Sequence, residues 1–175
     1  TSTATTDNIM VYNALTGEIQ YTTTPVGGGG GGVDGTKVRL GDGAGQTDQM
    51  DNAVAIGQSA GSNGQGLAAV AIGQYAGWLN QAGFAAAMGY AAGYNNQSDD
   101  AVAIGTNAGY NNQGDSAIAI GKNAAVNNQP ANSIILNATG EDSSVTATNS
   151  GFFVKPVTST ATTDNIMVYN ALTGE

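Results

Sequence analysis

The pattern of apolar and polar positions repeats every sixteen residues through the centre of the chain. Each repeat holds a short β-prone block of the type AVAIG, such as Ala101 to Gly105, followed by a Gly- and Asn-rich stretch that ends in Gln113. The columns that define the period contain Gly57, Gly73, Gly89, Gly105 and Gly121, and an aliphatic column before them includes Ile56, Ile72, Ile104 and Ile120. A strict period this short is typical of a solenoid, whose coils stack because one coil cannot bury its own apolar face. We therefore predict an all-β fold, a parallel β-solenoid (β-roll) of about seven such coils.

Both faces of each short strand in this pattern are apolar. Alternate residues of a strand point to opposite faces, so Val102 and Ile104 share one face while Ala103 lies on the other. We expect the Val and Ile columns to fill the interior of the coils. The small Ala column, which includes Ala103 and Ala119, is then expected to lie against another copy of the solenoid. In the other half of each coil, stacked Asn and Gln side chains are expected to hydrogen-bond from coil to coil.

The segment at the start of the chain recurs at its end. Residues 158–175 repeat residues 1–18 without a change, at an offset of 157 residues. This identity indicates a tandem array in which residues 158–175 begin the next unit, and a boundary that happens to overlap is the alternative. We divide the chain into a β-hairpin module (1–25), a Gly-rich linker (26–37), the solenoid (38–140), a neck or connecting strand (141–157) and the start of the next repeat (158–175).

The predicted hairpin module consists of two β-prone runs around a turn. Residues 9–12 and 19–22 flank a segment in which Asn13 opens the turn and Gly17 is free to adopt a positive φ. Six consecutive glycines follow at 27–32. A flexible linker is the favoured interpretation of this run, and a point of close packing between chains is the alternative.

Composition and charge narrow the classes of function. Charged residues make up 10% of the chain and 27 of its 175 residues are glycine, which is typical of a fibre rather than of an ordinary globular domain. The net charge is −9 with only 4 Lys and Arg residues, so we expect no nucleic-acid partner. No apolar run approaches the roughly 20 residues of a membrane-spanning helix, and we expect no membrane span in this segment.

The residue types that carry most enzyme chemistry are missing. Cysteine and histidine are both absent, which removes thiol nucleophiles, imidazole bases and the usual zinc ligands. The acidic residues are scattered over turns without a cationic or imidazole partner, so no paired acid and base can be identified. We therefore expect no catalysis and no cofactor.

The repeated blocks AVAIG, AIAIG and AVAIGxxAG resemble the head repeats of YadA-like trimeric autotransporter adhesins, which are left-handed parallel β-rolls also found in viral and phage fibre proteins. The segments NSIILNATG, GFFVKPV and NIMVYNALTGEIQYT resemble the region that follows such repeats in viral fibre proteins. The resemblance covers about residues 38–157 and both copies of the hairpin segment. It implies a parallel homotrimer located outside the cell, on a cell surface or on a virion surface, and it implies no reaction.

Two columns are candidates for a site. Asp99 and Asp115 lie one coil apart, and carboxylates about 5 Å apart repel one another unless they are screened or bridged by a cation such as Ca²⁺. A solvated turn is the favoured interpretation, and we assign no metal. Trp78, Tyr94 and Tyr110 form an aromatic column that could bind glycan rings or a protein ligand, and packing between subunits is the alternative.

Three functions without catalysis fit a rod of this kind. A structural repeat unit of an extracellular or virion fibre is our first prediction, and its partners are further copies of itself. The alternative is a trimeric adhesin head that binds a host or surface ligand. An ice-binding solenoid would need a flat Thr-rich face, and the coils contain no Thr column.

Overall fold

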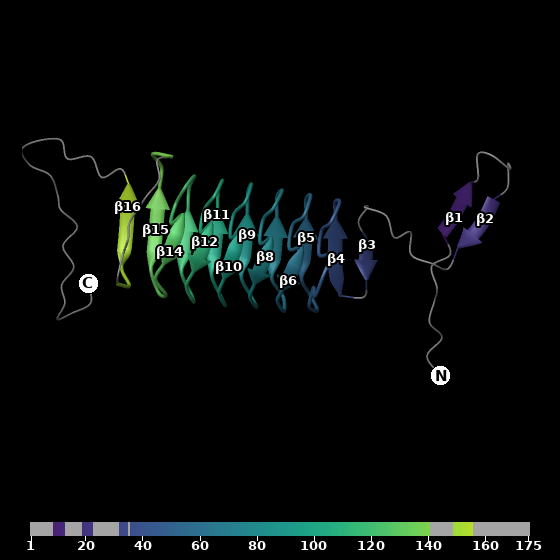
Figure 1. Cartoon of the computed structure of the whole chain (residues 1–175), viewed down its shortest axis with the longest axis horizontal. Coiled ribbons are helices and arrows are strands. Elements are labelled where there is room, and N and C mark those ends of the chain that lie inside the picture. Colours follow the sequence, from purple (N-terminus) through teal and green to yellow (C-terminus); the bar gives the residue numbers. More distant parts are fainter. Residues whose placement is uncertain (1–8, 13–18, 23–31, 35, 141–148, 156–175) are drawn as a thin grey trace, which may run out of the picture.

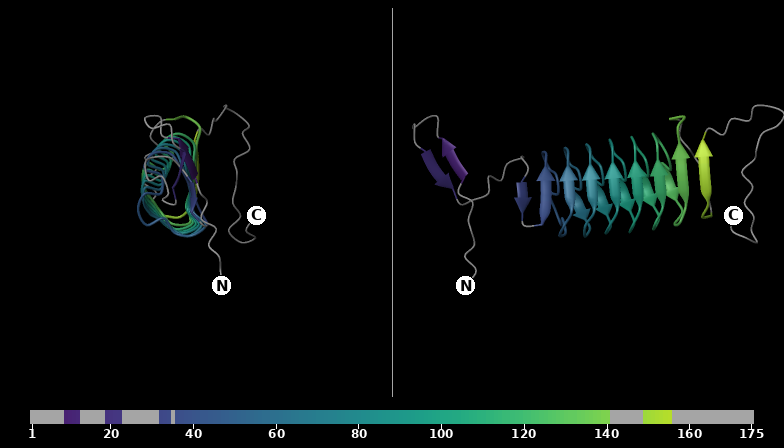
Figure 2. Two further views of the ribbon diagram at one scale, coloured as in Figure 1. Left: turned by 90° about the vertical axis from the view of Figure 1, so that its right-hand side faces the viewer. Right: turned by 180° about the vertical axis from the view of Figure 1, so that it is seen from behind.

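The computed structural model describes residues 9–12, 19–22, 32–34, 36–140 and 149–155. These residues are all-β and contain no helix. Between residues 37 and 155 the strands lie side by side in chain order along one direction (Figure 1). When the coils are viewed along that direction, they superimpose as a flattened ring (Figure 2). The predicted parallel β-solenoid of about seven turns is confirmed.

The coils contribute short strands to two sheets, and the five coils that begin with β5, β7, β9, β11 and β13 contribute one strand to each. The nine-stranded sheet, here called the Val/Ile sheet, has β3 and β16 at its ends and seven coil strands between them. These are β4 (Lys37–Leu40), β5 (Val54–Ile56), β7 (Val70–Ile72), β9 (Ala86–Met88), β11 (Val102–Ile104), β13 (Ile118–Ile120) and β15 (Ile134–Asn137). The five-stranded Asn/Gln sheet contains β6 (Asn63–Gln65), β8 (Leu79–Gln81), β10 (Asn95–Gln97), β12 (Asn111–Gln113) and β14 (Asn127–Gln129).

The strand register follows the sequence period. In the Val/Ile sheet Val102 pairs with Ile118 and Ile104 pairs with Ile120, and in the Asn/Gln sheet Gln97 pairs with Gln113. All parallel neighbours from β4 to β15 keep this sixteen-residue offset. Columns of the sequence are therefore columns of the structure, and each residue stacks on its equivalent one coil away.

Both ends of the Val/Ile sheet carry an additional strand. β3 (Gly32–Asp34) pairs antiparallel with β4, and β16 (Phe152–Lys155) pairs parallel with β15. The interval 26–37, which we predicted to be a linker, therefore includes β3 and the first residue of β4. The interval 141–157 includes β16, which extends the sheet of the solenoid.

β1 (Ile9–Tyr12) and β2 (Ile19–Thr22) form an antiparallel pair in which Ile9 lies opposite Thr22 and Tyr12 lies opposite Ile19. The residues between these strands, 13–18, lie outside the described part of the chain. The second copy of the segment, at 158–175, also lies outside it.

The interior of the coils is lined by alanine, so our prediction that Val and Ile fill it is wrong. In the coil around β11, Ala101, Ala103 and Ala108 are completely buried and face the buried side chain of Gln113. In contrast, 38% of the surface of Ile104 remains exposed. The two sheets of one coil lie so close together that methyl groups and a glutamine fill the space between them, and Val or Ile on the inner face would overpack it.

Larger residues replace alanine at the two ends of the interior column. Arg39 in β4 pairs with Ala55 of the next coil, and Ile135 in β15 pairs with Ala119 of the coil before it. Phe153 in β16 follows Ile135 and packs against the buried alanines. These bulkier side chains lie at the two ends of the described stack of coils, where they cover the alanines of the outermost coils.

The coils turn at fixed positions that have a positive φ. Gly105, which follows the Val/Ile strand, has a φ of 119°, a value suited to glycine alone. Asn96, Asp100, Asn107 and Gly109 lie between 53° and 57°, in the left-handed region that Asn and Asp tolerate best. The same positions recur in the neighbouring coils, so these bends form columns as well.

Candidate functional site

A buried amide ladder holds the coils together from within. The Gln97 side chain donates through Nε2 to Gln113 Oε1 at 3.1 Å, to Ala86 O at 2.9 Å and to Ala101 O at 3.1 Å. The same contacts recur along a column of buried glutamines, namely Gln49, Gln65, Gln81, Gln97, Gln113 and Gln129. The predicted hydrogen bonding from coil to coil is confirmed, and it satisfies polar groups inside a core that excludes water.

The ladder has a direction, because each glutamine from Gln49 to Gln113 donates to the next glutamine on its C-terminal side. Gln65 accepts from Gln49 in this way, whereas Val33, sixteen residues before Gln49, has no side-chain donor. The Oε1 of Gln49 is accordingly buried without a hydrogen-bond partner. The ladder therefore ends at the N-terminal coil on an unsatisfied acceptor, which costs free energy at that end.

The outer surface of the Asn/Gln sheet is polar. Asn80 donates to Asn96 Oδ1 at 3.0 Å, Asn96 donates to Asn112 at 3.0 Å, and Asn112 donates to Asn128 at 2.9 Å. These exposed amides can also hydrogen-bond with water, so this face is stable in solvent without a partner.

The outer surface of the Val/Ile sheet is apolar along its whole length. Its two outward columns consist of Val38, Val54, Val70, Ala86, Val102, Ile118 and Ile134, and of Leu40, Ile56, Ile72, Met88, Ile104, Ile120 and Leu136. All of them are half-buried or exposed, and Met88 is 47% exposed. A continuous apolar strip of this kind is typical of a surface that binds a partner.

An aromatic cluster lies at one corner of the flattened coil. The rings of Trp78 and Tyr94 are stacked with centroids 4.9 Å apart, and those of Tyr94 and Tyr110 are stacked at 4.6 Å and nearly parallel. Tyr75 contacts both Tyr90 and Tyr94 edge-on, at 6.2 Å and 6.4 Å. The predicted aromatic column is thus one side of a larger cluster.

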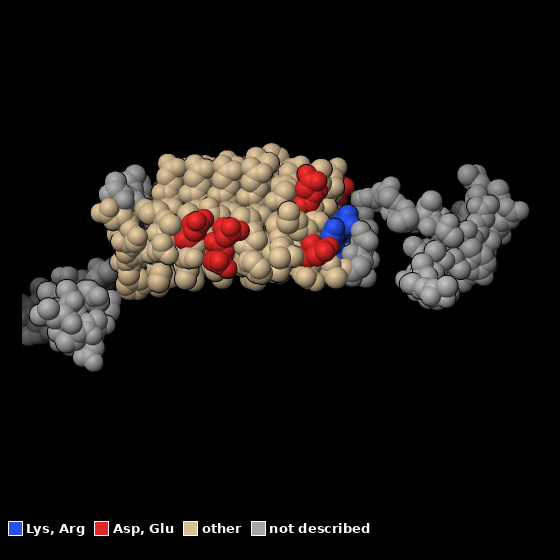
Figure 3. All heavy atoms as spheres, turned by 90° about the horizontal axis from the view of Figure 1, so that it is seen from below, with Lys and Arg blue, Asp and Glu red and all other residues tan. Residues whose placement is uncertain are grey.

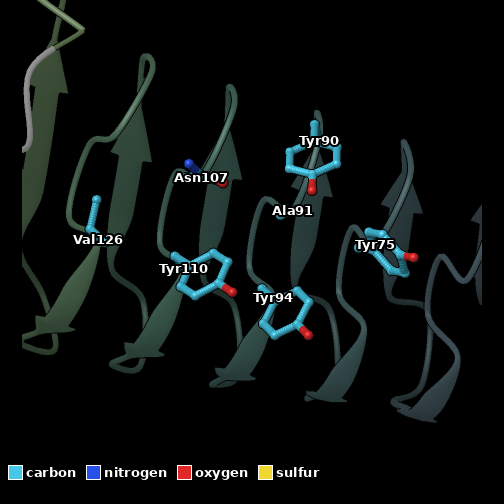
Figure 4. A pocket seen from close by; sticks show the side chains of 7 residues that line it. All are labelled: Tyr75, Tyr90, Ala91, Tyr94, Asn107, Tyr110 and Val126. Carbon is cyan, nitrogen blue, oxygen red and sulfur yellow. The ribbon is translucent and has the colours of Figure 1, made fainter.

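The cluster borders a groove with a volume of about 560 Å³. Figure 4 shows Tyr90 and Asn107 on one side of it, Tyr94 and Tyr110 on the other, and Ala91 between the two rows. We did not predict Tyr75, Tyr90, Ala91 or Asn107 from the sequence, because they lie in different columns from the stacked rings. A break in the repeat could have indicated these residues, because the two turn columns contain only one tyrosine each, Tyr75 and Tyr90.

The groove environment changes the acidity of one tyrosine. Burial raises the pKa of Tyr94 above its usual value, and the neighbouring tyrosines Tyr110, Tyr75 and Tyr90 raise it further. The phenol of Tyr94 therefore retains its proton and remains a hydrogen-bond donor at every pH near neutrality.

The acidic column has an explanation within the fold. Asp99 accepts a hydrogen bond from the backbone N–H of Gly83 at 2.8 Å, which fixes the turn between the two sheets. Figure 3 views one face of the molecule and shows the acidic side chains on it in separate groups. Lys37 lies 3.8 Å from Asp51 near one end. Among the described residues, no three acidic side chains lie close enough together to hold a metal ion.

Two further findings bear on function. In the described part of the chain, no helix has the length and apolar character needed to cross a membrane. None of the protein-family models, curated proteins and solved structures that we compared with this chain matches it.

Proposed function

We propose that this chain is a structural repeat unit of an extracellular or virion fibre, without catalytic activity, and that it assembles as a parallel homotrimer. The observation that carries this proposal is the apolar outer surface of the Val/Ile sheet. Because Val and Ile face outward rather than inward, the rod presents its largest aliphatic side chains to whatever surrounds it. The alanines that we expected at the contact between copies are instead inside the coils.

A second copy of the same chain is the partner that fits this surface best. The apolar columns repeat at the coil spacing of about 4.8 Å, so a parallel copy in register meets Val and Ile at every coil. Full burial of one such side chain contributes about 1.5–3 kcal/mol. Ile104 and Ile120 are already largely covered, each with 38% exposed, so each gains a part of that amount. The repeat multiplies this gain along the rod.

The number of copies and the tandem arrangement have separate support. The resemblance to trimeric β-roll proteins supports three copies around one axis. The identity of residues 1–18 and 158–175 supports a fibre in which one 157-residue unit follows another. A rod that is continuous from unit to unit needs no reactive site, which agrees with the lack of histidine and cysteine.

The test compares charge introduced on the two outer faces of the same coils. The unsubstituted chain is expected at three times its mass of 17.3 kDa in light scattering after gel filtration. Ile104→Lys with Ile120→Lys places two like charges in the apolar contact and is expected to give monomers with an unchanged circular dichroism spectrum. The control pair, Asn111→Lys with Asn127→Lys, lies in the Asn/Gln sheet and is expected to stay trimeric. A monomeric parent protein, or trimers that survive the Ile104 and Ile120 changes, would contradict the proposal.

A trimeric adhesin head is the second candidate function. The aromatic cluster is the observation that favours it, because a purely structural rod requires no local departure from its repeat. Tyr75, Trp78, Tyr90, Tyr94 and Tyr110 are confined to three neighbouring coils in the middle of the solenoid.

A further inference from the structure

The groove beside the aromatic cluster exists because one turn column is interrupted by a small residue. Residues sixteen apart in this column are Ser59, Tyr75, Ala91, Asn107 and Asn123, and all have a φ between 51° and 59°. Ala91 stands between a tyrosine and an asparagine, and its methyl group leaves the space above it empty. The backbone of the coil is unchanged there, so the groove is formed by side-chain choice alone.

The walls of the groove are arranged for an elongated ligand. Tyr75 closes one end, since its ring contacts both Tyr90 on one wall and Tyr94 on the other. The groove then runs past Ala91 toward Val126, three coils beyond Tyr75. Three coil steps of about 4.8 Å make it roughly 14 Å long. A volume of about 560 Å³ lies within the range of about 300–1,000 Å³ that small-ligand sites occupy.

The chemistry of the walls is aromatic and hydroxylic without any formal charge near neutrality. Tyr90 is 51% exposed, so much of its ring can still pack against the C–H groups of a ligand. The phenol hydroxyls both donate and accept hydrogen bonds. Asn107 donates through Nδ2 to Asn123 Oδ1 at 3.2 Å, and its side-chain amide adds a polar group to the lining of the groove.

From these observations, we propose that this groove binds a neutral oligosaccharide. A sugar ring offers an apolar C–H face to the tyrosine rings and hydroxyl groups to the phenols and to Asn107. An acidic glycan would meet no Lys or Arg side chain in the groove, and the protein has a net charge of −9 that repels it. The inference goes beyond the structural role proposed above and gives the adhesin alternative a class of ligand.

A second copy of the chain is the alternative binding partner for the aromatic cluster. The position and shape of the groove favour a small ligand instead. The apolar strip of the Val/Ile sheet ends before the glycine bend, and the groove lies on the far side of that bend. A partner built of regular coils presents a periodic surface, whereas the residues that line the groove differ from coil to coil and Tyr75 lies across one end. A groove with such a lining fits a small ligand better than it fits the repeating surface of a second coil stack.

The test uses the whole chain on an array of immobilised neutral and acidic glycans, followed by isothermal titration calorimetry with the neutral glycan that is retained most strongly. The single tryptophan, Trp78, stacks on Tyr94 and supplies a second measurement through its fluorescence. We expect retention on neutral glycans and not on acidic ones. Retention on acidic glycans alone, or on none, overturns the inference.

Three variants connect binding to the groove. Tyr90→Ala removes an exposed ring and is expected to weaken binding by about tenfold. Ala91→Asn fills the floor of the groove with the same residue type that occupies the equivalent position, Asn107, in the next coil. Because asparagine tolerates the left-handed backbone better than alanine does, we expect the fold to persist while binding is lost. Ser59→Asn makes the same change in the same column outside the groove and is expected to leave binding intact.

Binding that survives Ala91→Asn overturns the inference. A Tyr90→Ala variant that lowers the oligomer mass overturns it as well, because the cluster is then a contact between copies. The outcome is separable from the fibre proposal. A trimer that retains no glycan contradicts only the groove, and a monomer that binds neutral glycan contradicts only the trimer.

Discussion

The Val/Ile sheet and the Asn/Gln sheet are built from the same coils, yet they present opposite surfaces to their surroundings. In both sheets the coil strands are parallel, keep the sixteen-residue register and turn small or amide side chains inward. On the outside, one carries branched aliphatic columns and the other carries hydrogen-bonded asparagines. The internal packing of the rod is therefore satisfied by alanine and glutamine, and the outer faces are free to differ.

This difference separates the residues that fold the coil from the residues that meet a partner. Ala103 and Gln113 are buried and determine how closely two sheets can approach. Ile104, one residue from Ala103, contributes to no interior contact of that kind and remains 38% exposed. We therefore expect substitutions at inner positions of the two sheets to lower stability far more than substitutions at outer positions.

The largest difference is expected between two glycines that bracket one turn. Gly105 leaves the Val/Ile sheet with a φ of 119°, and a Cβ there would lie 2.8 Å from the backbone carbonyl carbon of Gly121. Gly105→Ala combines backbone strain with a clash against the next coil, and we expect it to lower the free energy of unfolding by about 4 kcal/mol. Urea unfolding followed by circular dichroism measures this change.

Gly109, which enters the Asn/Gln sheet, is the matched comparison. Its φ is 55°, and the atom that a Cβ would approach most closely is the Oε1 of the Gln113 side chain. Ala125 already occupies the equivalent position one coil later with a φ of 51°. We therefore expect Gly109→Ala to cost only about 1–2 kcal/mol. If both substitutions lower the free energy of unfolding equally, the two bends do not differ in their need for glycine.

The second prediction concerns inner and outer amides of the Asn/Gln sheet. Gln97→Leu keeps the approximate volume but removes four hydrogen bonds from a dry interior, including those with Gln81 and Gln113. We expect a loss of about 2–3 kcal/mol, because backbone carbonyls and a neighbouring amide lose buried partners. Asn111→Ser removes the exposed bond to Asn127 and is expected to cost about 0.5 kcal/mol, since water replaces it. The same urea experiment measures both, and a Gln97→Leu variant as stable as Asn111→Ser would contradict the role of the buried ladder.

The fold was accessible from the sequence because repetition makes the register visible. Once Gly105 and Gly121 are seen to be equivalent, the stacking of coils and the glutamine ladder follow from spacing alone. The direction in which the strands face was not accessible in the same way. An AVAIG strand has apolar residues on both faces, and alternation states which residues share a face without stating which face is inside.

The groove was harder to predict because it depends on turn geometry. Tyr75 and Ala91 have a φ of 59° and 51°, a backbone conformation that neither residue favours by itself. The stacked coils impose this conformation, so local residue preference gave no indication of the turn. Without the turn, Tyr90 and Tyr94 cannot be placed on opposite walls of one groove, and only the column of Trp78, Tyr94 and Tyr110 could be read from the spacing.

The smallest effect is expected at Tyr94, which lies at the corner between the two sheets. Burial raises the pKa of Tyr94, and the neighbouring tyrosines add to this. Above the usual tyrosine pKa of about 10, the unfolded chain loses its proton first while the folded chain keeps it, so folding becomes less favourable as the pH rises. The stability associated with this group is fully present below a pH of about 10 and is lost as the pH rises through the folded pKa.

Titration of the Tyr94 ζ-carbon by NMR, assigned through its absence in Tyr94→Phe, measures the shift in the pKa of Tyr94. Trp78→Ala uncovers one face of the ring and is expected to return the pKa toward its usual value. A midpoint equal to that of the urea-unfolded chain, with or without Trp78, would show that the stacked column leaves Tyr94 as open to water as the asparagines of the outer sheet.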